Sequence, residues 1–105
     1  MLVRIKENSW IAKLAAKKLK TKQVAMVLGK TIHLHNTSKA EFLQNTKWLT
    51  HEAVHVQQYM QYGFARFLAM YLLESFKKGY FNNRFEKEAR DKENDQTVLS
   101  GLTFI

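Results

Sequence analysis

The sequence contains no cysteine, only four glycines, and no long hydrophobic run. Without cysteine there is no disulfide framework and no thiolate metal site, so any metal ion must be held by His, Asp or Glu. The longest strongly apolar stretch, residues 67–73, is far too short to span a bilayer. Residues 1–8 carry charges where a signal peptide needs an apolar run. These absences predict a soluble, cytoplasmic protein with no membrane span.

Acidic residues are scarce at the start of the chain. Residues 1–30 contain eight Lys or Arg and one acid, a net charge of +7, although the whole chain carries only +8. A basic segment of this kind can bind nucleic acid, anionic lipid or an acidic protein, or can simply be a solvated face. The 105 residues include 46% hydrophobic and 12% aromatic residues. This length and composition predict one domain, residues 1–105, with a real core.

The hydrophobic pattern changes period several times and predicts an α+β fold. Capping residues and glycines mark the element boundaries. The expected elements are a short strand at 1–6, an amphipathic helix at 9–20, a hairpin of strands 23–28 and 31–35, a short helix from 38 to 44, and helices at 47–62, 64–77 and 83–94. Residues 96–105 form a tail or a last strand. The apolar positions of the helix at 64–77, from Phe64 to Phe76, are predicted to be core.

The helix at 47–62 carries the pattern HExxH, as His51-Glu52-Ala53-Val54-His55. Residues four apart lie on one face of a helix, so both imidazoles can bind one zinc ion while Glu52 reaches a water molecule on it. A catalytic zinc site needs a third protein ligand. The extended pattern HExxHxxGxxH requires Gly at 58 and His at 61, but both positions are Gln. The remaining common choice is a carboxylate from a separate helix, and Glu86 and Glu88 are the two candidates.

These motifs resemble the minimal gluzincin-type metallopeptidases over roughly residues 24–93. The resemblance is carried by GKTIHLH at 29–35, WLTHEAVHVQQY at 48–59, Tyr80, and EKEA at 86–89. It implies a zincin-like domain with an N-terminal helix, a short sheet, the HExxH helix and C-terminal helices. It also implies that His51, His55 and Glu86 bind zinc and that Glu52 is the general base.

Two parts of this site stay open at the sequence level. Many relatives carry Asp four residues after the ligand Glu, where this chain has Arg90 followed by Asp91. The groups that orient the zinc-binding histidines are therefore undefined, and Glu88 remains an alternative ligand.

Amide hydrolysis also needs a donor to the developing oxyanion. The available side chains are Tyr80, Tyr59, His33 and His35, and we favour Tyr80. The alternative interpretation of Tyr80 is an aromatic residue that only packs against its neighbours. The strand at 31–35 can pair with an extended peptide substrate, which would place His33 and His35 along the cleft.

The sequence thus predicts a zinc-dependent metallopeptidase that acts on a peptide or protein. An alternative is an inactive zinc-binding domain that serves as a protein-interaction module. A small basic nucleic-acid-binding protein is the third reading, although the chain has neither a recognition-helix signature nor interleaved aromatic and basic residues.

Overall fold

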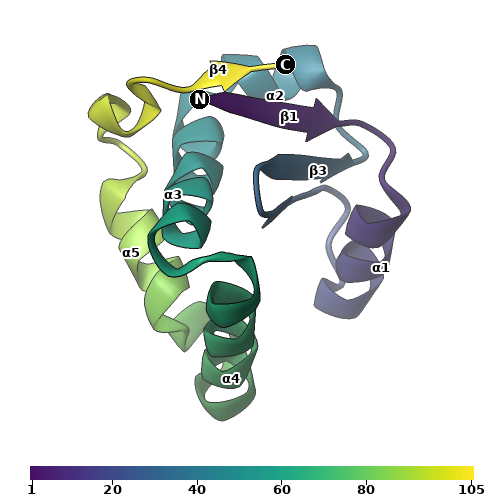
Figure 1. Cartoon of the computed structure of the whole chain (residues 1–105). Helices are drawn as coiled ribbons and strands as arrows, with labels where there is room; N and C mark the ends of the chain where they lie inside the picture. Colours follow the sequence, from purple (N-terminus) through teal and green to yellow (C-terminus); the bar gives the residue numbers. More distant parts are fainter.

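Five α-helices and a four-stranded mixed sheet form the fold in the computed structural model, which describes residues 1–105 (Figure 1). The α+β class is therefore confirmed. The elements are β1 (Leu2–Lys6), α1 (Trp10–Leu19), β2 (Val24–Leu28), β3 (Thr31–His35), α2 (Lys39–Gln44), α3 (Thr46–Tyr62), α4 (Phe64–Asn82), α5 (Arg84–Lys92), the 3-10 turn η1 (Gln96–Leu99) and β4 (Thr103–Phe104). No helix is both long enough and apolar enough to cross a membrane.

Helix boundaries follow the capping residues of the sequence. Ser9, Ser38, Asn45 and Asn83 each accept a backbone N–H in the first turn of α1, α2, α3 and α5, respectively. Such side chains satisfy N–H groups that have no partner inside the helix. Gly79 adopts φ 80° and ψ 167°, so the regular part of α4 stops there although three more residues coil before Asn83. The predicted helix end at this glycine is confirmed, because few other residues tolerate such a conformation.

The strands are ordered β2-β3-β1-β4 across the sheet. The hairpin β2–β3 is antiparallel and turns at Gly29, as predicted, whereas β1 runs parallel to both β3 and β4. The C-terminal residues therefore form a last strand rather than a tail. The order leaves β2 at one edge and places β3 in the interior, where both of its sides are already paired.

Side chains alternate between the two faces of the sheet. Val27, Ile32 and Leu34 join the main core cluster with Leu49 and Val56 of α3. On the other face Val24 packs with Ala12 and Ala16 of α1. The HExxH helix is thereby fixed on one face of the sheet, and α5 covers its far side through Ala89 packed with Ala53 and Val54.

The prediction that the apolar face of α4 is core was confirmed for only part of the face. Phe67 is buried, at 1% exposed, and Leu68 and Tyr71 are half-buried against the core. Phe64 and Leu72 are more than half exposed, and Phe76 is 89% exposed. Helix α4 packs against α3 and α5, which cover only part of the apolar stripe and leave its other residues in solvent.

Helix α1 packs on the sheet through its alanines rather than through its larger apolar residues. Trp10 and Leu14, which share the apolar spacing of the sequence, point into solvent, and the helix packs instead through Ala12 and Ala16. Small side chains let a helix approach a sheet closely, so the alanines form the contact and the larger apolar residues remain outside.

Candidate metal centre

Three side chains from two helices converge on one point. His51 and His55 lie one turn apart on α3, and Glu86 lies in the first turn of α5. The Oε1 atom of Glu86 is 3.0 Å from Nε2 of His51 and 3.0 Å from Nε2 of His55. One ligand atom from each residue lies within 4.8 Å of the others, so the three can share one metal ion. His55 and Glu86 are buried, and His51 is half-buried.

Each histidine is held from behind through its other ring nitrogen. Nδ1 of His51 donates to Oε2 of Glu93 at 2.9 Å, and Nδ1 of His55 donates to Oε1 of Gln58 at 2.8 Å. The Gln58 amide is itself oriented, because its Nε2 donates to the Phe85 carbonyl and to Glu88. Its oxygen must therefore face His55, which requires a proton on Nδ1 and leaves the Nε2 lone pair for a metal.

Sequence reasoning missed both orienting residues. Glu93 lies seven residues after Glu86, at the C-cap of α5, where the backbone is still helical and places its carboxylate on the same side as Glu86. Gln58, which the sequence analysis used only to exclude the extended HExxH pattern, is 2% exposed. The spacing His55-x-x-Gln58, one helical turn, was the signal that could have identified it.

A third missed contact involves Tyr71 on α4. Its hydroxyl donates to Oε2 of Glu86, which turns Oε1 of the same carboxylate towards the two imidazoles. The Tyr71 ring also packs edge-on against His55, with ring centroids 6.1 Å apart. Tyr71 was assigned only to the core, and its polar end belongs to the metal centre.

The electrostatics of the cluster suit a cation. Burial raises the pKa of Glu86, but its hydrogen bonds to His51 and His55 outweigh this and hold the pKa well below its usual range. Burial lowers the pKa of His51, whereas its hydrogen bond to Glu86, the charge of Glu52 and the hydrogen bond to Glu93 together raise it to about 9. The cluster therefore binds protons at the point where its ligand atoms converge.

His51, His55 and Glu86 are arranged as a metal ion would require. With Nδ1 of each histidine occupied by its own proton, two Nε2 lone pairs and a carboxylate oxygen face one another at hydrogen-bond distance. Three acceptors in such proximity require a positive charge between them, either protons or a metal cation. Two imidazoles and one carboxylate form a donor set typical of catalytic zinc.

Glu52 lies beside this centre and does not join it. Its side chain is 6% exposed, and burial raises its pKa to about 7, against the opposing charges of His55 and His51. A carboxyl with a pKa near neutrality can both accept and release a proton at physiological pH.

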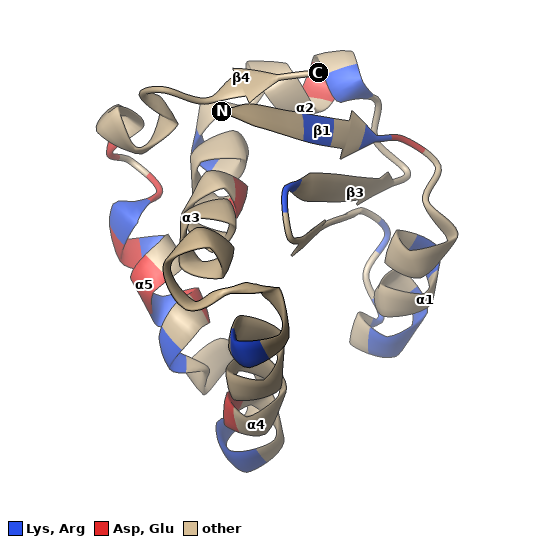
Figure 2. Ribbon diagram, viewed as in Figure 1, with Lys and Arg blue, Asp and Glu red and all other residues tan.

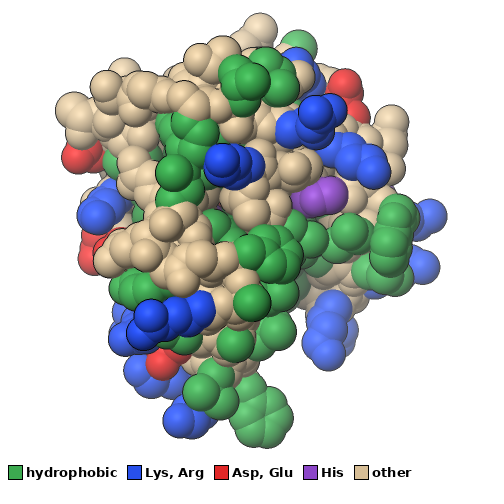
Figure 3. All heavy atoms as spheres, viewed as in Figure 1, with side chains coloured by type: hydrophobic (Ala, Val, Ile, Leu, Met, Phe, Trp, Pro, Cys, Tyr) green, Lys and Arg blue, Asp and Glu red, His purple; other side chains and the backbone are tan.

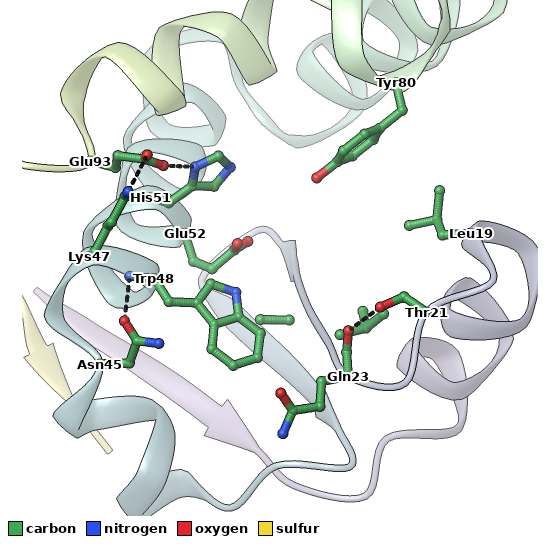
Figure 4. A pocket seen from close by; sticks show the side chains of 12 residues that line it. Leu19, Thr21, Gln23, Asn45, Lys47, Trp48, His51, Glu52, Tyr80 and Glu93 are labelled. Carbon is green, nitrogen blue, oxygen red and sulfur yellow. Dashed lines mark hydrogen bonds and ion pairs between the residues drawn. The ribbon is translucent and has the colours of Figure 1, made fainter.

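Figure 4 shows Glu52 pointing into a hollow between α3, Tyr80 and the end of α1. The hollow has two parts that meet at Glu52, Tyr80 and strand β2. One part, about 560 Å³, is lined by His51, Lys47, Trp48 and Glu93; the other, about 450 Å³, is mostly apolar and reaches His55, Glu86 and Tyr71. We call the two parts together the cleft.

Tyr80 and Trp48 lie on opposite walls of this cleft. Tyr80 follows the break at Gly79, and its hydroxyl points towards the His51 and Glu52 side (Figure 4). Burial raises the pKa of Tyr80, with a smaller contribution from the charge of Glu86, so its hydroxyl stays protonated at neutral pH. Trp48 packs edge-on against Phe42 and also lines the cleft, so it serves the core and the site together.

Several sequence expectations for the site were wrong. Glu88 does not reach the cluster and instead accepts a hydrogen bond from Gln58. Strand β3 cannot add a peptide, because β2 and β1 occupy both of its edges. His33 is buried against α1, with its Nδ1 2.9 Å from the Ser9 hydroxyl, and neither it nor His35 lines the cleft. Tyr59 does line the apolar part, but its ring packs on Phe64 and Phe67.

Comparison of the chain with protein families, with curated proteins and with solved structures found no match. The function is therefore inferred from the geometry of the cluster and the cleft.

Proposed function

We propose that this chain is a zinc-dependent peptidase with a zincin-like, gluzincin-type site. The observation that carries the proposal is the convergence of His51, His55 and Glu86 on one point beside the buried carboxyl of Glu52. Bound zinc would supply a Lewis acid and lower the pKa of a coordinated water towards neutrality. The orienting contacts from Glu93, Gln58 and Tyr71 support the same assignment, because metal-binding histidines and carboxylates normally have such partners.

The residues of the chain have separate roles in this proposal. Glu52 accepts the proton of the attacking water and passes it to the leaving amine, for which a pKa of about 7 is suited. Tyr80 donates a hydrogen bond to the oxyanion that forms on the scissile carbonyl, since its hydroxyl remains protonated and faces the cleft.

The edge strand β2 is the proposed binding site for the substrate backbone. All five of its residues, Val24–Leu28, line the apolar part of the cleft, and no strand pairs with its outer edge. An extended peptide can add to such an edge, with its backbone hydrogen-bonded to β2. One substrate side chain would then enter the apolar part, which favours a large hydrophobic residue next to the scissile bond.

Metal content tests the first half of the proposal. The purified protein should bind about one zinc ion per chain, and His51→Ala should abolish this binding. Elemental analysis that finds no stoichiometric metal, together with the same thermal stability of wild type and His51→Ala with added zinc, would exclude a zinc site.

Hydrolysis tests the second half. Wild type should cleave members of a peptide library, and Glu52→Gln should retain zinc but lose cleavage; Asp91→Asn is the matched control, because Asp91 is an exposed carboxylate on α5 outside the cluster. Full activity of Glu52→Gln would show that Glu52 is not the base. Zinc binding without cleavage by wild type would favour an inactive interaction module instead.

A further inference from the structure

The outward face of α4 is apolar and has no partner in the structure. Ala65, Ala69, Leu72, Leu73 and Phe76 follow one another at the spacing i, i+4, i+7, i+8, i+11 and are all exposed. Leu72 and Leu73 are each more than half exposed, and Phe76 is almost completely so. A stripe of this kind exceeds the scattered apolar residues that any surface carries, and it indicates a binding face.

The outward face of α1 combines apolar and basic side chains. Trp10, Lys13, Leu14, Lys17 and Lys18 recur at i, i+3, i+4, i+7 and i+8 and are all exposed. None of these three lysines forms an ion pair; the only lysines that do are Lys47, Lys78 and Lys92. The helix contains no acidic residue, so its outward face carries an uncompensated positive charge.

The two faces flank the same opening. Leu19 of α1 and Leu72 of α4 both line the apolar part of the cleft. The C-terminal ends of both helices point the same way, away from β1, β4 and the chain termini (Figure 1). Figure 2 shows basic residues at both of these ends, whereas the acidic residues gather mainly on α5. In Figure 3, hydrophobic side chains cover much of the lower half of the molecule, with basic side chains around them.

We propose that the outward faces of α1 and α4, together the α1–α4 rim, bind the surface of an anionic membrane. The lysines would contact lipid headgroups, and Trp10, Leu14, Leu73 and Phe76 would enter the boundary between headgroups and acyl chains. Trp is suited to this boundary because its ring is apolar and its N–H is polar. The mouth of the cleft would then face the membrane.

The combination of basic and hydrophobic side chains on the α1–α4 rim favours an anionic membrane over a nucleic acid. A nucleic acid would match the lysines through its phosphates, but it would leave Leu73 and Phe76 in water. A membrane interface accommodates both kinds of side chain on one face. The proposal does not require hydrolysis, because it rests on residues outside the metal centre.

Co-sedimentation with vesicles tests the proposal. The full chain should bind vesicles of phosphatidylcholine with phosphatidylglycerol and bind pure phosphatidylcholine much more weakly, with binding that falls as salt rises. The double variant Leu73→Ser/Phe76→Ser should weaken binding by about tenfold or more, because both side chains would enter the interface. Leu2→Ser is the control: Leu2 is 60% exposed but lies on β1, away from the rim.

The charge contribution is tested separately. Lys13→Gln/Lys17→Gln should weaken binding by about tenfold or more, since each lysine near an anionic surface contributes of the order of 1 kcal/mol. The charge-matched control, Lys30→Gln/Lys87→Gln, should bind as wild type does. All these side chains are exposed, so circular dichroism should show the same fold in every variant.

Three outcomes would overturn the proposal. They are the absence of vesicle binding by wild type, unchanged binding by Leu73→Ser/Phe76→Ser, and tighter binding to duplex DNA than to anionic vesicles at the same salt. The last result would assign the basic surface to nucleic acid.

Discussion

Replacing Glu86 with glutamine removes the negative charge that faces both histidines of the metal centre. In the metal-free protein this charge sustains the protonated form of His51, whose pKa stands at about 9 against a usual value of 6.5. The pKa of His55 is also raised: burial lowers it, but the hydrogen bond to Glu86 and the charge of Glu86 outweigh this effect. The Glu86→Gln variant should lose most of this stabilisation.

The size and pH range of the effect follow from the pKa of His51. The pKa of His51 is higher in the folded than in the unfolded protein, so protonation of His51 adds to the free energy of unfolding. This contribution is fully present below about pH 6.5 and is lost as the pH rises through 9. The difference corresponds to about 3 kcal/mol. In wild type Glu52 releases its own proton at lower pH, through about 7. Glu52 and Glu93 also raise the pKa of His51 and remain in the variant, so we expect Glu86→Gln to be less stable than wild type by about 2 kcal/mol at pH 7, with a gap that closes above pH 9.

Urea unfolding in the presence of a chelator measures this gap, with the fluorescence of Trp10 and Trp48 as the signal. Asp91→Asn is the control, because Asp91 is an exposed carboxylate on the same helix with no hydrogen-bond or ion-pair partner. It should unfold as wild type does at every pH. A wild-type stability that stays constant between pH 7 and 9, or equal stability of wild type and Glu86→Gln at pH 7, would refute the reasoning.

Three further outcomes are expected. Glu93→Gln should weaken zinc binding by about 10- to 100-fold in a competition titration with a chelating dye, because the carboxylate orients His51, a proposed zinc ligand; unchanged affinity would show that Glu93 does not support the site. Tyr80→Phe should lower kcat by about 10²-fold with little change in KM if its hydroxyl binds the oxyanion, and an effect on KM alone would indicate substrate packing. Phe67→Ala should destabilise the protein by about 3–5 kcal/mol in urea unfolding, whereas Phe76→Ala should change stability by about 0.5 kcal/mol or less.

Local sequence signals predicted most elements of this fold because their physical cause is local. The hairpin turn at Gly29 and the breaks at Gly63 and Gly79 depend on backbone conformations that glycine adopts easily, and each lies where the sequence placed it. Strand order depends on contacts between distant segments, which no local pattern encodes. The expectation that β3 would receive a substrate therefore failed once β1 had paired beside it.

In the candidate metal centre, too, local sequence patterns predicted some residues and not others. The pairing of His51 with His55 follows from helical periodicity alone, and Glu86 was reached through the resemblance to a family. Tyr71 was assigned only to packing, because it is part of the apolar pattern of α4 and this pattern does not indicate where its hydroxyl lies. The hydroxyl in fact donates to Glu86. Burial was the least predictable property: Phe67 and Phe76 share one apolar pattern, but only the first meets the core.

Asn83 fixes the start of α5, the helix that carries Glu86 of the candidate metal centre. Its side chain is completely buried and donates to the Tyr71 carbonyl at 3.0 Å and to the Ser75 hydroxyl at 2.9 Å, while its oxygen caps α5 at Phe85. One amide thus locks the start of α5 to the middle of α4, and Glu86 stands three residues further on. Tyr71 of α4 in turn donates to Glu86, so the position of α4 bears on the carboxylate that faces the two histidines of α3. A substitution of Asn83 could therefore alter the candidate metal centre without changing any residue of the HExxH helix.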